Sequence, residues 1–145
     1  MSDEEALARR CAEVMWADDT ASRGLGMTID RVAAGHARLS MPVRSDMLNG
    51  LGLCHGGFIF ALADSAMAFA ANAYGDKAVA WHADITYFRP GKPGEVLSAT
   101  AEERSRAGRS GIYDVRVTGS SDGSTVAEFR GHTRLSGGRF FTEGA

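Results

Sequence analysis

Residues 55–74 form a stretch of apolar and small side chains that contains a single charged residue, Asp64. Its seven alanines favour a helix, which we expect to span residues 55–74 and to end with Gly75 as its C-cap. A helix that is apolar on all sides must be covered on all sides, so we expect a sheet to wrap around it or a second subunit to share it. An unpaired carboxylate inside such a helix costs several kcal/mol, so Asp64 needs either a structural partner or a chemical role.

The segments on either side predict one further helix and an antiparallel sheet. Ser2 followed by Glu5 fits a capping box, which places an amphipathic helix over residues 2–19. Alternating apolar residues between glycine-containing turns predict six strands, at residues 25–33, 36–43, 79–88, 95–106, 110–119 and 124–135. The expected fold class is α+β. The expected organisation is an N-terminal helix over 1–20, one domain over 21–136 and a flexible tail over 137–145.

Charge and composition exclude several classes of function. A net charge of −2 argues against a nucleic-acid or anionic-membrane partner. The acidic start of the chain does not resemble a secretory signal, and no apolar run approaches the roughly 18 residues that cross a bilayer. We therefore expect a cytoplasmic protein in which Cys11 and Cys54 are free thiols.

Metal and nucleotide cofactors are not expected either. The four histidines, at positions 36, 55, 82 and 132, do not have the spacing of a metal site. The run from Gly50 to Gly52 lacks the lysine and hydroxyl residue of a phosphate-binding P-loop. The chemistry must therefore come from the protein's own groups.

The segment before Asp64 predicts an oxyanion-binding site. Gly56 and Gly57 at the start of a helix leave unpaired backbone N–H groups open to a ligand oxygen, and the helix dipole adds positive character there. Such a group of donors suits acyl transfer, with Asn49 and His55 as further side-chain donors. Each residue also has a structural alternative: the glycines allow close packing, Asn49 forms a turn, and His55 bonds to the backbone at the helix start.

The spacing of Gly56 and Asp64 has a consequence for assembly. They are eight residues apart, which is about 12 Å along a helix that rises about 1.5 Å per residue. A carboxylate that attacks a carbonyl held by the Gly56 N–H must lie within roughly 6–7 Å of that N–H. One helix cannot satisfy this limit, whereas two antiparallel helices related by a twofold axis can. If both residues are catalytic, the protein must be at least a dimer with shared sites.

With these residues in place, the sequence resembles the hotdog-fold acyl-CoA thioesterases of the PaaI type, from phenylacetate degradation. The resemblance rests on Asn49, the His55-Gly56-Gly57 step, the Leu62-Ala63-Asp64 step and the later Tyr87-Phe88-Arg89-Pro90-Gly91. It covers about residues 20–136. It implies a sheet wrapped around the long helix and a homodimer with joined sheets, usually paired into a homotetramer.

The same resemblance implies roles for individual residues. Asp64 corresponds to the family's nucleophile or general base, Gly56 to its oxyanion donor, and Asn49 and His55 to its two further site residues. Many members carry a Ser or Thr on the strand after the helix to position water, but this chain has no hydroxyl between residues 80 and 84. His82 and Ser65 are the available substitutes.

The resemblance also implies an acyl-CoA substrate, with an aromatic acyl group of the phenylacetyl or hydroxyphenylacetyl type. Expected substrate contacts are Gly57, Phe58, Arg89, Pro90, Arg106 and Arg109, where the arginines would hold the phosphates of coenzyme A and solvated turns are the alternative. Two rival functions are an enoyl-thioester hydratase or dehydratase, and a non-catalytic acyl-CoA-binding protein. Thioester hydrolysis with release of free thiol separates them.

Overall fold

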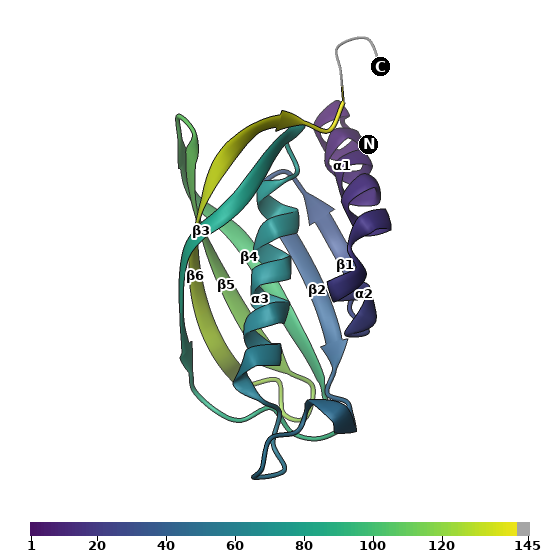
Figure 1. Cartoon of the computed structure of the whole chain (residues 1–145), viewed down its shortest axis with the longest axis vertical. Coiled ribbons are helices and arrows are strands. Elements are labelled where there is room, and N and C mark those ends of the chain that lie inside the picture. Colours follow the sequence, from purple (N-terminus) through teal and green to yellow (C-terminus); the bar gives the residue numbers. More distant parts are fainter. Residues whose placement is uncertain (142–145) are drawn as a thin grey trace.

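A single antiparallel sheet curves around the long helix, as Figure 1 shows for the computed structural model of the chain. The structure describes residues 1–141. Its elements are α1 (Asp3–Asp18), α2 (Thr20–Gly24), β1 (Thr28–Ala33), β2 (His36–Pro42), the 3-10 helix η1 (Ser45–Met47), α3 (Gly56–Ala71), β3 (Asp76–Tyr87), β4 (Val96–Ala107), β5 (Ser110–Gly119) and β6 (Thr125–Arg139).

The strand order is β1-β2-β4-β5-β6-β3, which leaves β1 and β3 as the two edges. The predicted α+β class and all six predicted strands are therefore confirmed. Alternation along β5 buries Tyr113, Val115 and Val117 at the face that packs against α3, as their spacing in the sequence predicts. Close packing of α3 on the sheet requires Gly131, because a Cβ atom there would overlap the Met67 sulfur.

The N-terminal helix begins as predicted, with the capping box between Ser2 and Glu5. Its buried residues include Ala8 and Cys11, and Figure 1 shows α1 and α2 beside β1. The short helix α2 is not predicted by the sequence pattern. It begins where the Asp19 side chain accepts a hydrogen bond from the Ser22 N–H, and it delays the first strand to Thr28.

The long helix ends earlier than predicted. It stops at Ala71, and Asn72 rather than Gly75 is its cap. The buried Asn72 amide donates to the carbonyls of Ala68 and Ala78 and accepts from the Ala78 N–H, so it ties the helix end to β3. Gly75, with a φ of +96°, instead forms the turn into β3, which begins at Asp76.

The predicted flexible tail is wrong for its first residues. Strand β6 continues to Arg139, which pairs with Asp76 at the start of β3, and the Phe140 N–H donates to the Gly75 carbonyl. These backbone bonds order a segment whose glycines, Gly137 and Gly138, suggest flexibility in the sequence alone. Residues 142–145 lie outside the described part of the chain.

One face of α3 is incompletely covered by its own chain. Gly57, Ala61, Asp64 and Ala68 recur every three or four residues on this face, and each is exposed or partly exposed, whereas the opposite face is buried against the sheet. The expectation that α3 is covered on every side is therefore met on the sheet side only. None of the helices within residues 1–141 is long and apolar enough to span a membrane.

Candidate active site

The start of α3 presents a backbone donor without an acceptor. His55 is the N-cap, and its Nδ1 accepts the Gly57 N–H at 2.9 Å. The Gly56 N–H, at the first helical position, has no hydrogen-bond acceptor among the described residues. Of the two glycine amides expected to hold an oxyanion, Gly56 is therefore free and Gly57 is already bonded.

This cap also defines the protonation pattern of His55. A ring nitrogen that accepts a hydrogen bond carries no proton, so neutral His55 has its proton on Nε2. The His55 side chain is exposed and lies edge-on to the Phe58 ring, with 6.1 Å between ring centroids. His55 thus has the structural role considered as its alternative, and it also offers an Nε2–H donor next to the Gly56 N–H.

Tyr87, which the sequence singles out only as part of the motif from Tyr87 to Gly91, fixes the same helix start. The Tyr87 hydroxyl, at the end of β3, donates to the Gly56 carbonyl at 2.9 Å. The two residues are so close that a Cβ atom on Gly56 would lie 3.1 Å from the phenol. Glycine at position 56 therefore allows the close approach of Tyr87 as well as access to the N–H.

Asn49 organises the loop before the helix. Its Oδ1 accepts the N–H groups of Leu51 and Leu53 at 2.9 and 3.2 Å, and its own N–H donates to the Leu53 carbonyl at 2.7 Å. The turn role is therefore present. Because Oδ1 faces the loop backbone, the Nδ2 amide is the part of the side chain left to act as a donor toward a substrate.

Asp64 has no hydrogen-bond or ion-pair partner within residues 1–141. Burial raises the pKa of its carboxyl above the ordinary aspartate value. It lines an open cleft of about 490 Å³ between α1, α3 and β3, whose apolar walls include Val14, Met67 and Val79. Residues 1–141 therefore supply no structural partner for this carboxylate.

Asp64 and Gly56 lie on one continuous helix, which extends from Gly56 to Ala71. Their separation of about 12 Å along the helix axis, the value expected from the sequence, therefore holds in the structure. The two groups cannot act on one bond within a single chain.

The two residues named as substitutes for the missing hydroxyl, Ser65 and His82, make other contacts in the structure. The Ser65 hydroxyl is hydrogen-bonded to Ser22 Oγ of α2 at 2.9 Å. The exposed His82 ring packs against His132, which alternates with the inward-facing Gly131 and so lies on the outer face of the sheet.

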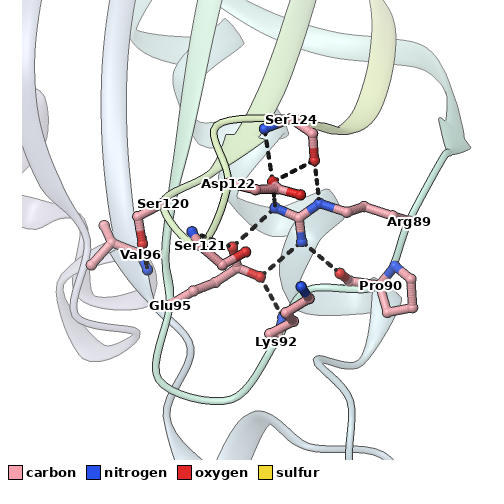
Figure 2. A network of polar contacts seen from close by, with 9 residues as sticks. All are labelled: Arg89, Pro90, Lys92, Glu95, Val96, Ser120, Ser121, Asp122 and Ser124. Carbon is pink, nitrogen blue, oxygen red and sulfur yellow. Dashed lines mark hydrogen bonds and ion pairs between the residues drawn. The ribbon is translucent and has the colours of Figure 1, made fainter.

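The structure gives Arg89 a different environment from the expected phosphate site, as Figure 2 shows. Its Nε donates to Ser124 Oγ (2.7 Å), Nη1 to the Pro90 carbonyl and Glu95 Oε2 (both 2.9 Å), and Nη2 to Glu95 Oε1 (3.0 Å) and Asp122 Oδ1 (3.3 Å). These bonds match the five N–H donors of a guanidinium. Neither Arg89 nor the Pro90 carbonyl is thus free to bind coenzyme A without breaking this network.

Arg106 and Arg109 retain donors that face solvent. They line a cleft of about 260 Å³ with Ala71 and Tyr74, at the end of α3 remote from Gly56. The Arg106 guanidinium lies 3.5 Å from the centre of the Tyr74 ring, and Arg109 Nη2 donates to the Leu135 carbonyl at 3.0 Å.

No group of three or more metal-binding side chains occurs in the described residues.

Comparison with known proteins agrees with this fold. Residues 51–126 match the family model described as the thioesterase superfamily. The chain is 40% identical to the acyl-coenzyme A thioesterase PaaI of Escherichia coli K12 over 127 residues, which is 88% of this chain and 90% of the relative. The structure of the E. coli PaaI protein from the phenylacetic acid degradation operon superimposes with a TM-score of 0.92 at 38% identity, covering 94% of this chain and 99% of that one.

A more distant structure, that of a Streptococcus mutans UA159 protein bound to acetyl-CoA, has a TM-score of 0.74 at 26% identity and covers 78% of this chain and 90% of that one. The chain belongs to the thioesterase superfamily and has the hotdog fold, so it is an enzyme of the thioester hydrolase class. Within that superfamily it is of the PaaI type, as the sequence resemblance indicated.

Proposed function

We propose that the protein hydrolyses a small aromatic acyl-CoA to the free acid and coenzyme A, in sites shared between two subunits. The observation that carries this proposal is the pairing of an unpartnered carboxylate with a free backbone donor on one helix. Asp64 and the Gly56 N–H are both left without partners by the described chain, and their separation requires a second copy to complete the site.

The incompletely covered face of α3 supports such a dimer. Its small residues Gly57, Ala61 and Ala68 allow a second helix to approach closely. If two antiparallel α3 helices bring Asp64 beside Gly56 of the partner subunit, the twofold axis passes near residue 60. The same arrangement places each Asp64 at the opposite end of one shared interface.

The edge strand β3 supports the joining of the two sheets. Among residues 1–141 it pairs with β6 alone, which leaves its other edge open, and Val79 and Trp81 on it are 54% and 58% exposed. An open edge with exposed large apolar residues is a surface that proteins usually cover. A second copy of β3 would cover it and extend the sheet across the dimer.

The reaction follows from this geometry. The thioester carbonyl oxygen accepts the Gly56 N–H of one subunit, where the helix dipole and the Nε2–H of His55 stabilise developing negative charge. Asp64 of the other subunit either removes a proton from the water that attacks the carbonyl carbon, or attacks this carbon itself to form an anhydride that water then hydrolyses. In both cases the C–S bond breaks, and coenzyme A leaves as the thiolate and takes up a proton. The raised pKa of Asp64 makes it a stronger base than an exposed aspartate, while the positive end of the partner's helix favours the ionised form that either role needs.

The cleft at Arg106 and Arg109 is a suitable place for the nucleotide part of coenzyme A. An axis near residue 60 places residue 71, at this cleft, opposite about residue 49 of the partner subunit. The guanidinium of Arg109 makes one bond to a backbone carbonyl, which leaves other donors for a phosphate. In this proposal each subunit contributes Asp64 and its basic cleft to the site that begins at the partner's helix start.

The aromatic acyl group rests on the name of the E. coli relative and on the residues that surround the site. Phe58 and His55 present rings beside Gly56, and the cleft at Asp64 has apolar walls. A hydratase requires a histidine paired with an acid, and His55 makes no bond to a carboxylate within the described chain, so release of free thiol is the observation that separates hydrolysis from hydration.

The test is hydrolysis of a panel of short-chain, aromatic and long-chain acyl-CoA thioesters, followed by a thiol-reactive disulfide dye. We expect thiol release to be fastest with phenylacetyl- or hydroxyphenylacetyl-CoA. Asp64→Ala should abolish kcat while acyl-CoA binding, measured by calorimetry, stays within a few-fold of wild type. Unchanged hydrolysis by this variant would refute the role of Asp64, and binding without any thiol release by the wild type would favour the non-catalytic alternative.

A further inference from the structure

The segment from Tyr87 to Glu95 contacts the start of α3 at two residues, Cys54 and Gly56, which lie on either side of His55. The free Gly56 N–H belongs to the peptide between His55 and Gly56. On one side of this peptide, the Gly91 carbonyl accepts the Cys54 N–H at 2.9 Å. On the other, the Tyr87 hydroxyl donates to the Gly56 carbonyl at 2.9 Å. The two residues that flank His55 are therefore both held by one segment.

The contact at Gly91 is close as well as hydrogen-bonded. A Cβ atom on Gly91 would lie 2.9 Å from the Cys54 Cβ, a distance that would force one of the two backbones to move. Any displacement of the segment is thus transmitted directly to Cys54, two residues before Gly56. A free N–H can hold an oxyanion only if its direction is fixed before the substrate arrives.

The part of this segment between β3 and β4 has no strand or helix to order it. Backbone hydrogen bonds tie its two ends to Val126 and Val43, and between them it is held by the Arg89 network, which we define as Arg89, Glu95, Asp122 and Ser124 (Figure 2). Glu95 is only 5% exposed. Its carboxylate also accepts the Lys92 N–H, so it bonds both to Arg89 and to the backbone of the same turn.

The Arg89 network also attaches the turn to the rigid sheet. Asp122 and Ser124 belong to the turn between β5 and β6, and the network packs so tightly there that a Cβ atom on Gly119 would overlap Glu95 and Arg89. Burial alone would raise the pKa of Glu95, but hydrogen bonds from Arg89 and the Lys92 amide lower it to about 2. The pair is therefore ionised throughout the working range of an enzyme.

We propose that Arg89 and Glu95 are positioning residues for thioester hydrolysis: their ion pair fixes the turn that, through Gly91 and Tyr87, aims the Gly56 N–H. This inference rests on the proposed function for its chemistry and on the hydrogen bonds above for its geometry. It replaces the phosphate-binding role expected for Arg89 with an indirect one. Tyr87 makes the contact on the helix side, at the Gly56 carbonyl, which belongs to the peptide that follows the one carrying the free N–H.

The experiment compares two substrates that share an acyl group. One is the acyl-CoA, and the other is the matching N-acetylcysteamine thioester, which lacks the nucleotide. Misplacement of a reacting group by about 1 Å can cost about a hundredfold in rate. We expect Arg89→Ala to lower kcat about ten- to a hundredfold on both substrates, with KM changed less than about threefold. Arg89→Lys should recover part of the loss, because a lysine keeps the ion pair but not the fork of hydrogen bonds.

Two milder variants keep the test decisive if Arg89→Ala does not fold. Tyr87→Phe removes one hydroxyl and Glu95→Gln one charge, and each should lower kcat about tenfold on both substrates. The matched control is Arg116→Ala, which breaks an exposed ion pair with Glu128 (2.7 Å) on the outer face of the sheet and should leave kcat unchanged.

The outcomes separate the alternatives. A rise in KM for the acyl-CoA alone, with kcat unchanged, would show that Arg89 contacts phosphate and would overturn the positioning role. Wild-type kcat in Tyr87→Phe and Glu95→Gln would also overturn it. Amide hydrogen exchange at Cys54 gives a readout without turnover: it should accelerate in Glu95→Gln and not in Arg116→Ala. If the wild type hydrolyses no thioester, the proposed function fails. The exchange result still tests whether the Arg89–Glu95 ion pair holds the backbone at Cys54.

Discussion

Replacing Gly56 with proline tests the oxyanion donor with little change to the helix. Gly56 is the first residue of α3 and its φ is not positive, so proline is well accommodated there. The preceding residue, His55, has φ −61° and ψ 133°, the extended conformation that proline requires before it. The substitution therefore removes one N–H group while the cap between His55 and Gly57 remains.

Gly56→Ala is the matched control, because it adds a Cβ atom but keeps the N–H. Both variants bring that Cβ to about 3.1 Å from the Tyr87 phenol, so both bear the same crowding at this atom. The difference between them reports the N–H group together with the proline ring carbon that replaces its hydrogen. Loss of one oxyanion donor costs about a hundred- to a thousandfold in kcat, or about 3 kcal/mol of transition-state stabilisation. We expect kcat of Gly56→Pro to fall below that of Gly56→Ala by this factor.

The assay is thiol release at saturating acyl-CoA, with thermal unfolding and dimer content measured on the same samples. The alanine variant sets the loss due to crowding, and the proline variant should show a similar unfolding temperature. Equal kcat values for the two folded variants would refute the assignment of the Gly56 N–H as the donor, whatever their activity relative to wild type.

Three further predictions follow from the site and from the Arg89 network. Mixing inactive Asp64→Ala and Gly56→Pro subunits should restore about a quarter of the wild-type rate, because random pairing makes half the dimers mixed and each mixed dimer has one intact site; no recovery after verified exchange would contradict shared sites. Asp64→Asn should unfold at a higher temperature than wild type at pH 7, since a carboxyl with a raised pKa destabilises the folded chain when ionised, and the difference should shrink as the pH falls. The pKa of Glu95 is lowered to about 2 in the folded protein, against about 4.5 in the unfolded chain, so ionised Glu95 stabilises the fold above pH 4.5. This contribution, up to about 3 kcal/mol, is lost as the pH falls toward 2. In urea titrations, the free energy of unfolding should therefore fall less between pH 5 and 3 in Glu95→Gln than in wild type.

Local patterns predicted most of the fold. The alternation in β5, the capping box at Ser2 and the alanine-rich helix each depend on residues close together in the sequence, and each is confirmed. The end of α3 and the length of β6 depend on contacts with β3. Asn72 ends the helix because Ala78, six residues later, returns to meet it, and β6 reaches Arg139 because Asp76, far away in the sequence, lies beside it. Neither contact follows from the periodicity of apolar residues.

The candidate site shows the same division. The free amide of Gly56 and the unpartnered carboxylate of Asp64 could be expected from the sequence, because a glycine at a helix start and a lone charge in an apolar helix are local features. The role of Arg89 could not, since its partners Asp122 and Ser124 lie more than 30 residues further along the chain. The burial of Glu95, which points to a structural partner for Arg89, is visible in the structure alone.

The uncovered face of α3 has a kinetic consequence. If each active site needs Asp64 of one chain and the Gly56 N–H of another, turnover per chain depends on the fraction of the protein that is dimeric. Dilution below the dissociation constant of the pair should silence the enzyme without unfolding it, and the rate should then rise with the square of the protein concentration. The reaction rate would thus depend more steeply on protein concentration than the rate of an enzyme that is active as a monomer.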